Sequence, residues 1–281
     1  TATPGQTPLG PPQTRLEDNF ARVWAHTDWP LAAGYTTRSW VWGPAAFDTV
    51  AEPYQQGANG RRMVQYWDKA RMEINDPAAD PTTPWYVTNG LLVVEMVDGR
   101  LQLGDNQYEA RAPAQEPVVG DPSAVNPDAP SYAALRGIAS LNGDHQAASA
   151  PGTTITAYLD RRGVAGSNAK LGDYGVRVGQ YVAETHHNVA DRFWTYLQQQ
   201  GLMYDGGSLA NGPLLNWVYV TGYPISEPYW VTAGIGGKPY AVLVQLFQRR
   251  VLTYIPDFAP EWQVQMGNVG QHYHAWRYDQ P

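Results

Sequence analysis

The chain contains no cysteine among its 281 residues. This absence excludes disulfides, thiolate nucleophiles and cysteine-based zinc sites. Charged residues are few, at 16%, and no apolar run is long enough to cross a bilayer. We therefore expect few long solvated helices and no membrane span. A secreted protein of this size without disulfides is more typical of bacteria than of animals.

Basic clusters are also missing, and the net charge of -7 makes nucleic acid an unexpected partner. The chain has no phosphate-binding loop and no dinucleotide fingerprint. It also lacks a Gly-x-Ser-x-Gly elbow, and neither Ser167 nor Ser208 lies in a comparable pattern. The sequence therefore predicts neither nucleotide binding nor serine-hydrolase chemistry.

The abundant residues are 28 Gly, 23 Pro, 11 Trp and 18 Tyr, against only 5 Phe. Frequent glycine and proline predict many turns, as in sheet-rich folds. Tryptophan and tyrosine carry a polar tip on an apolar body, so they suit half-exposed binding faces as well as cores. We predict an α+β fold, predominantly β, with two diverged helix-plus-β-hairpin modules flanking a small β-rich middle section.

The composition divides the chain into five parts. Residues 1–15 form a proline-rich arm and 110–131 a linker or long loop, because both are dense in proline. The other parts are module copy 1 at 16–109, a β-rich middle section at 132–186 and module copy 2 at 187–281.

Hydrophobic periodicity predicts helices at 16–27 and 188–199, and the dipeptide Asp98-Gly99 predicts a hairpin turn. The tail 269–278 alternates weakly, as a strand does. Strands are expected at 35–42, 62–67, 71–74, 85–97, 100–103, 153–160, 174–182, 214–220, 241–247 and 251–254.

The two modules share a series of short phrases in the same order. Glu52-Pro53-Tyr54 in copy 1 matches Glu227-Pro228-Tyr229 in copy 2. After a glycine-rich turn, residues 64–69 (VQYWDK) match residues 244–249 (VQLFQR). The order and spacing predict an internal duplication.

The residues of copy 2 resemble modules of uncharacterised secreted proteins of Chloroflexota-type bacteria. The likeness rests on residues 184–188 (ETHHN), 222–230 (GYPISEPYW) and 244–254 (VQLFQRRVLTY). Copy 1 resembles the N-terminal half of the same family through residues 68–73 (DKARME) and 87–90 (VTNG). The sequence departs from the family's pattern at His186, within 184–188, where that pattern has glycine. A weaker likeness to the LGFP repeats of actinobacterial cell-wall proteins implies attachment to an envelope or glycan.

The densest polar cluster, residues 184–188, lies between a predicted strand and a predicted helix. Glu184 and His187 there fit an acid/base pair, with Glu227 as a third catalytic candidate. The alternative is that Asn188 caps the helix and the histidines only pack. Glu52 and Glu227 fit the carboxylate pair of a glycoside hydrolase, or else each holds its own turn.

His272 and His274, two apart on a predicted strand, would share a face and fit a metal site completed by His186 or His187. No spacing requires a metal, and we predict no cofactor. The predicted ligand-binding residues are one group of copy 2 aromatics and two charged residues of the copy 1 hairpin: Trp194, Trp217, Tyr223, Tyr229, Trp230, Asp68 and Arg71. The competing interpretation is core packing for the aromatics and a solvated hairpin for the charges.

Three hypotheses of function follow. The preferred one is a secreted, non-enzymatic binding or structural protein that contacts polysaccharide, cell envelope or its own subunits. The second is a glycan-active hydrolase or lyase using Glu184 and His187. The third is a filament or surface-layer subunit that forms homo-oligomers through the arm 1–15. The small, polar opening Thr1-Ala2-Thr3-Pro4 is typical of a chain after signal-peptide removal, so we expect an extracellular location.

Overall fold

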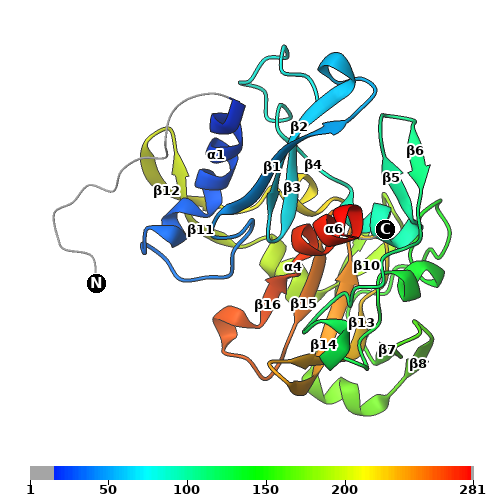
Figure 1. The fold of residues 1–281 in the computed structure, drawn as a ribbon. Helices are drawn as coiled ribbons and strands as arrows, with labels where there is room; N and C mark the ends of the chain where they lie inside the picture. The colour runs from blue at the N-terminus through cyan, green and yellow to red at the C-terminus, as the bar shows by residue number, and fades with distance from the viewer. Residues whose placement is uncertain (1–15, 280–281) are drawn as a thin grey trace.

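The computed structural model describes residues 16–279. An antiparallel sheet and a mixed sheet face each other with helices between them, and Figure 1 shows helix α6 lying between the strands β1–β3 and the strands β13–β16. The prediction of a predominantly β α+β fold is confirmed. Within the described residues, no helix combines the length and apolarity needed to cross a membrane. The predicted arm at 1–15 lies outside the described residues.

The first half of the chain begins with two helices and continues into a four-stranded sheet. Its elements are α1 (Leu16–Thr27), α2 (Trp29–Ala32), β1 (Ala46–Pro53), β2 (Arg61–Trp67), β3 (Ala70–Ile74), β4 (Thr88–Asn89), α3 (Leu92–Asp98), β5 (Arg100–Gln102) and β6 (Tyr108–Ala110).

The second half repeats the same sequence of sheet and final helix. The elements from the middle section onward are β7 (Ala157–Leu159), β8 (Ala165–Ser167), β9 (Val178–Val182), β10 (His187–Ala190), α4 (Asp191–Leu197), β11 (Gln200–Asp205), β12 (Ser208–Pro213), α5 (Trp217–Thr221), β13 (Tyr229–Ile235), β14 (Lys238–Leu246), β15 (Val251–Tyr254), β16 (Val264–Met266) and α6 (Val269–Tyr278). The short 3₁₀ turns are at 58–60, 123–125, 133–137, 169–174 and 260–262.

The strand orders show how the middle section joins the second sheet. The first sheet runs β1-β2-β3-β4, and the second runs β16-β15-β14-β13-β7-β8. Strand β7 pairs parallel to β13 through Tyr158 and Trp230. The middle section therefore extends the sheet of copy 2, while β9 pairs with β10 in a separate ladder.

Matching hydrogen bonds relate the two modules. Gly90 N–H donates to the Arg71 carbonyl at 3.0 Å, and Gly267 N–H donates to the Val251 carbonyl at 2.8 Å. Each bond joins the segment just before the final helix to the third strand of its module. Counting from these pairs, Leu92 corresponds to Val269 at the start of the two helices.

The final helix of each module docks on the hairpin of the other module. Val94 N–H in α3 donates to the Gln248 carbonyl, and Gln271 N–H in α6 donates to the Asp68 carbonyl. Asp68 and Gln248 occupy the same place in the two repeated phrases. The first-turn N–H groups of a helix have no acceptor within the helix, and each hairpin supplies a carbonyl acceptor for one of them. The modules are interlocked, with α3 and α6 packed between the sheets.

The strand register corrects one predicted correspondence. Val64 pairs with Val50, whereas its counterpart Val244 pairs with Tyr229. Tyr229 therefore corresponds to Val50, and Glu227 lies two residues before it. Glu52 lies two residues after Val50, so the two glutamates do not occupy equivalent positions, and the predicted match is wrong.

Several predicted strands are helical. The stretch 85–97 contains only the short strand β4, followed by helix α3, and Gly99 ends that helix at a φ of 74° rather than turning a hairpin. A mainly apolar segment has no hydrophobic periodicity by which a helix can be distinguished from a buried strand. Four of its side chains reach the core between the sheets from a single helix: Leu92, Val93, Met96 and Val97.

Three further strand predictions are wrong. Residues 214–220 contain helix α5, because the Asn216 side chain accepts the Tyr219 N–H and caps it. Residues 269–278 form helix α6 instead of a strand. Residues 35–42 are irregular, and the buried Asp28 carboxylate holds their end by accepting the N–H groups of Val41 and Trp42.

The predicted helix 188–199 begins only at Asp191, because residues 187–190 pair with β9. Asn188 is therefore not a helix cap. Its side chain instead donates to Ala148 O and accepts from Ala150 N. The prolines of 110–131 do not keep that segment out of the interior, since Ala114 and Val118 are buried in the core between the sheets.

Candidate functional site

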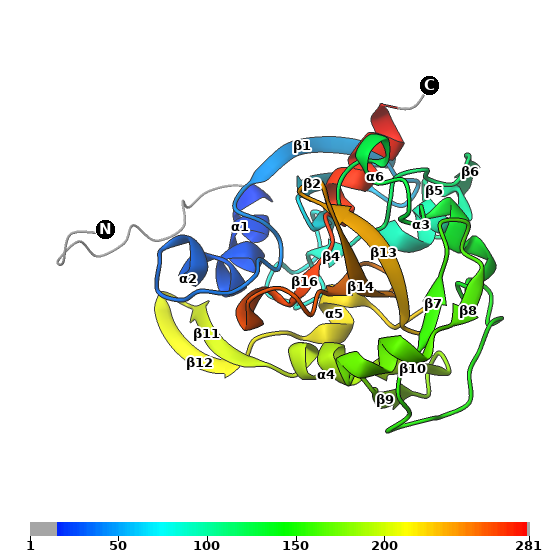
Figure 2. The ribbon, with the colours of Figure 1, turned by 90° about the horizontal axis from the view of Figure 1, so that it is seen from below.

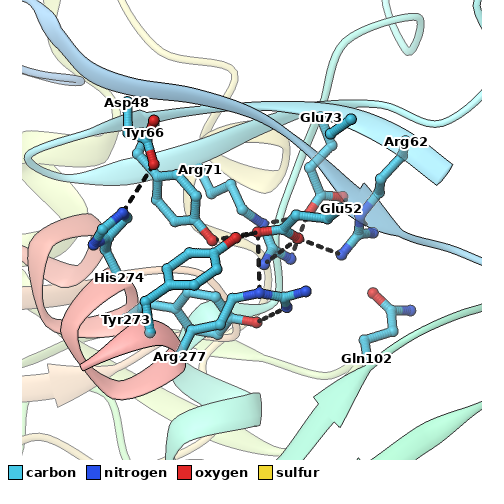
Figure 3. Close-up of polar contacts among 12 residues, drawn as sticks. Asp48, Glu52, Arg62, Tyr66, Arg71, Glu73, Gln102, Tyr273, His274 and Arg277 are labelled. Carbon is cyan, nitrogen blue, oxygen red and sulfur yellow. Dashed lines mark hydrogen bonds and ion pairs between the residues drawn. The ribbon is translucent and has the colours of Figure 1, made fainter. Parts of the chain in front are cut away.

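Buried charged side chains gather between the sheet of copy 1 and helix α6. Figure 3 shows Glu52 and Glu73 surrounded by the guanidinium groups of Arg62, Arg71 and Arg277. Glu73 accepts two bonds from Arg71, at 2.6 and 2.9 Å. Glu52 lies 3.2 Å from Arg71 and 3.1 Å from Arg277.

Helix α6 and helix α3 complete this network. Tyr273 in α6 donates to Glu95 in α3 at 2.5 Å, and Glu95 lies 3.4 Å from Arg71. Tyr66 and Tyr278 both donate to the same Glu52 oxygen. The three arginines and three glutamates balance in charge, and none of the six is more than 6% exposed. The network ties the interlocked helices to the first sheet.

The network shifts the pKa of its members. Burial alone would raise the pKa of Glu52, but the charges of Arg71 and Arg277 lower it to about 2. Burial raises the pKa of Glu95, because its arginine partner, Arg71, is more distant at 3.4 Å. Buried opposite charges within about 4 Å favour the ionised carboxylate, so Glu52 is an anion at every physiological pH.

This shift predicts acid sensitivity. A carboxyl whose pKa falls from 4.5 to about 2 on folding stabilises the protein above pH 4.5 and loses that contribution as the pH falls toward 2. The contribution amounts to about 3 kcal/mol. Urea unfolding between pH 7 and pH 2 should show this fall in wild type. The Glu52→Gln variant should lack this part of the fall in stability. A variant that keeps the full acid dependence of wild type would contradict the assignment.

Arg71 and Asp68, predicted to bind ligand, lie in different settings. Arg71 is wholly buried in the network, and Asp68 lies at the β2–β3 turn, where its carboxylate accepts from Gln271 at 2.7 Å. Arg71 is therefore not a solvated hairpin charge, whereas the bond between Asp68 and Gln271 lies at the surface. Both residues contact helix α3 or α6 of the protein itself.

The predicted aromatic residues of copy 2 are split between core and surface. Trp230 is 1% exposed, and its indole N–H donates to the Ile155 carbonyl. Trp194, Trp217 and Tyr223 are half-buried and form an edge-to-face series with ring centroids 5.6 and 5.7 Å apart. Tyr229 is also half-buried, on β13. These contacts are mutual packing.

His272 and His274 do not share a face, because they lie on helix α6 and not on a strand. Two residues apart on a helix means about 200° of rotation. His272 pairs with the Tyr132 hydroxyl at 3.0 Å, and His274 with Asp48 at 3.0 Å. Burial, with the charge of Lys69, lowers the pKa of His272 to about 4. Within residues 16–279, no three potential ligand side chains gather to hold a metal ion.

The structure brings His187 and Glu227 together but leaves Glu184 apart. His187 is fully buried, and its Nδ1 lies 3.0 Å from Glu227 Oε1. Glu227 also accepts from the backbone and side-chain N–H groups of Asn188. Glu184 is exposed in the turn between β9 and β10, with no hydrogen-bond partner in the part of the chain described. Of the three predicted catalytic residues, only His187 and Glu227 form a pair.

A cavity of about 930 Å³ opens between helix α1, the segment 82–87 and the hairpin β11–β12. Figure 2 shows α1 beside this hairpin. The aromatic side chains of its wall come from both halves of the chain: Trp42, Trp85, Tyr204 and Tyr219. Trp85 is 55% exposed, and the centroid of its ring lies 5.5 Å from that of Tyr219.

Hydrogen bonds between distant segments hold the walls of this cavity. The Tyr219 hydroxyl donates to the Val87 carbonyl at 2.7 Å, and Arg22 donates to the Pro81 carbonyl at 2.5 Å. His26 Nδ1 lies 3.2 Å from the Tyr204 carbonyl. A carbonyl can only accept, so Nδ1 carries the proton and Nε2 is left as an acceptor. The cavity is thus preformed, apolar in its aromatic walls and polar at His26, Arg22 and Asn216.

None of the aromatic residues of this cavity was predicted as a site residue from the sequence. Trp85 lies in a proline-rich loop within a predicted strand, and Tyr204 lies in a hairpin that was not predicted. The only available signal was the high content of tryptophan and tyrosine, which does not identify positions. The cavity exists because the two halves pack against each other.

The predicted resemblance to secreted bacterial modules stays a prediction. A comparison of the chain with family models, with curated proteins and with solved structures finds no match in any of the three.

Proposed function

We propose that the protein is an extracellular carbohydrate-binding protein, and that the cavity beside α1 holds one or more sugar units. The observation that carries the proposal is the preformed cavity of about 930 Å³ with the half-exposed Trp85 in its wall. The extracellular location follows from the resemblance to secreted bacterial proteins.

The chemistry of the cavity matches the chemistry of a sugar ring. A pyranose has an apolar face of C–H groups and a rim of hydroxyls that both donate and accept hydrogen bonds. Trp85 and Tyr219 offer aromatic faces on which the apolar face of the sugar can stack. Arg22 and Asn216 offer hydrogen-bond donors to the sugar hydroxyls, and His26 Nε2 offers an acceptor. The cavity volume accommodates a short oligosaccharide.

Both halves of the chain must be in place for this cavity to exist. The first half contributes α1 and Trp85, and the second contributes Tyr204, Asn216 and Tyr219. This requirement gives the duplication a use, because the interlocked modules hold the two walls at a fixed separation. Rigid walls reduce the entropy lost when a flexible saccharide binds.

Replacing Trp85 by alanine is expected to weaken saccharide binding by at least about tenfold, because an exposed aromatic anchor is lost. A glycan array of neutral and acidic bacterial polysaccharides would identify the ligand. Calorimetry with that ligand would then compare wild type with the variant.

Tyr108→Ala is the matched control. Tyr108 is an exposed aromatic on β6, 45% accessible and outside the cavity. It should bind like wild type. A wild-type protein that binds nothing on the array would contradict the proposal, as would equal affinities of wild type and Trp85→Ala.

A further inference from the structure

A second group of buried cations lies where the turn between β14 and β15 meets the first half of the chain. Arg250 in this turn is 0% exposed, and its guanidinium lies 5.1 Å from the centroid of the Trp42 ring. Its Nη1 donates to the Arg249 carbonyl at 3.2 Å, whereas Nε and Nη2 have no hydrogen-bond partner within residues 16–279. Stacking on an aromatic ring uses the face of a guanidinium and leaves its N–H groups free. Arg250 therefore buries unsatisfied donors of a cation.

The fold of the hairpin does not require an arginine at this position. Phe247 N–H donates to the Arg250 carbonyl at 2.9 Å, and the matching residues of copy 1, Trp67 and Ala70, are paired in the β2–β3 hairpin. Ala70 is as completely buried as Arg250, but its side chain is a methyl group. The buried charge is thus a property of copy 2 and not of the module.

The cations around Arg250 make hydrogen bonds to neutral oxygens. Arg249 Nη1 donates to two backbone carbonyls, at 2.8 and 3.1 Å, and Lys69 Nζ donates to the Asn268 amide oxygen at 2.6 Å. Burial and the charge of Arg249 lower the pKa of Arg250 to about 9. Burial also lowers the pKa of Lys69 to about 8, and the charge of Arg250 contributes to this fall. The positive charges of this region repel one another.

A nearby carboxylate does not compensate Arg250. The charge of Asp28 acts on Arg250, but the Asp28 oxygens accept the backbone N–H groups of residues 41–43, and burial raises the pKa of Asp28 to about 6. Arg71 provides the contrast within the same protein. Burial alone would lower the pKa of Arg71, but two carboxylates within 3.2 Å hold it well above its ordinary value. A buried guanidinium without such a counter-charge is strongly unfavourable.

We propose that Arg250 binds a monatomic halide anion, such as chloride, at the contact between the two modules. Nε and Nη2 direct N–H bonds from the same edge of the guanidinium plane, which is the arrangement that holds an anion with two parallel bonds. Arg250 has no exposed surface, so a group attached to a polymer cannot reach it, whereas a single ion can enter during local opening. A phosphate has more acceptor oxygens than these two nitrogens can serve. The proposal does not depend on carbohydrate binding.

Halide is expected to stabilise the folded protein, because an ion that binds only the folded chain shifts the unfolding equilibrium. The β14–β15 turn also accepts the Val94 N–H of helix α3, so an ion at Arg250 would stabilise a contact between the modules. Sodium chloride or bromide should replace sodium gluconate at constant ionic strength, which keeps general screening unchanged. The melting temperature of wild type should rise by about 5 °C at a halide concentration about a hundredfold above its Kd.

Two variants separate the site from a general salt effect. Arg250→Met should lose the rise, and in gluconate alone it should be at least as stable as wild type, because an unpaired buried charge is gone. Arg192→Met is the matched control, since Arg192 also lies over an aromatic ring, that of Tyr254, but is exposed. It should keep the full rise. A rise in wild type no larger than the rise in Arg250→Met would overturn the proposal.

Crystals of wild type grown in sodium bromide provide a test that needs no variant. The anomalous difference map should show a bromide peak in hydrogen-bond contact with Nε and Nη2 of Arg250. A water molecule there, with no anomalous peak, would overturn the proposal. Stabilisation of wild type by inorganic phosphate and not by halide would overturn it as well.

Discussion

Replacing Arg71 by methionine is expected to lower the free energy of unfolding by about 3–5 kcal/mol. Arg71 lies within 3.4 Å of three carboxylates, those of Glu52, Glu73 and Glu95, and it is wholly buried. Removing its charge leaves three buried acids with only Arg62 and Arg277 to compensate. The loss is therefore dominated by uncompensated charge and not by the lost packing of the side chain.

Urea unfolding followed by tryptophan fluorescence measures this loss. Arg162→Met is the matched control, because Arg162 also pairs with a carboxylate, Asp160, but is 76% exposed. Exposed pairs contribute about 0–1 kcal/mol, so the control should change little. If Arg71→Met lowers stability no more than Arg162→Met does, the network does not hold the modules together. Glu95→Gln, which keeps a hydrogen-bonding side chain, should fall between the two.

Replacing Gly270 by alanine is expected to lower the free energy of unfolding by about 3 kcal/mol. Gly270 lies in the first turn of α6, where the helix meets the β2–β3 hairpin. A Cβ at this position would lie 2.6 Å from the Ala70 carbonyl oxygen and still closer to that of Trp67. Both oxygens belong to the backbone, so neither can move without distorting the hairpin. The substitution would push α6 out of its site.

Gly137→Ala is the control, because a Cβ there meets nothing within 4 Å. It should leave the melting temperature within a few degrees of wild type, whereas Gly270→Ala should lower it by about 5 °C or more. A Gly270→Ala protein as stable as the control would show that α6 is not packed tightly on the hairpin. The corresponding position in α3 is Val93, which is buried, so the two helix contacts have diverged in side-chain size.

The repeated phrases of the two hairpins determined much of the architecture. Residues 64–69 and 244–249 alternate with the period of a strand, and strands formed at both places. Glycine, proline and aromatic content likewise indicated a mostly β fold. These signals are local, because every second side chain of a strand points to the same face, whichever element that face packs against.

The predictions from local sequence were wrong where the buried residues follow no regular period along the chain. Residues 91–97 are apolar apart from Glu95, so their sequence has no period that distinguishes a helix from a buried strand, and in the fold they enter helix α3. The tail 269–278 alternates weakly in sequence, yet it is a helix whose Tyr273 and Arg277 reach Glu95 and Glu52. Those partners are far away in the chain, so no short window contains the reason for the helix.

The candidate sites depended still more on the tertiary structure. His187 and Glu227 were identifiable by residue type, but they lie 40 positions apart and meet only in the folded chain. Trp85 and Tyr204 likewise face one cavity only because the two halves interlock. The sequence by itself determined the duplicated hairpins and the aromatic content. Only the folded structure decided which side chains meet, because these contacts join residues separated by 40 or more positions.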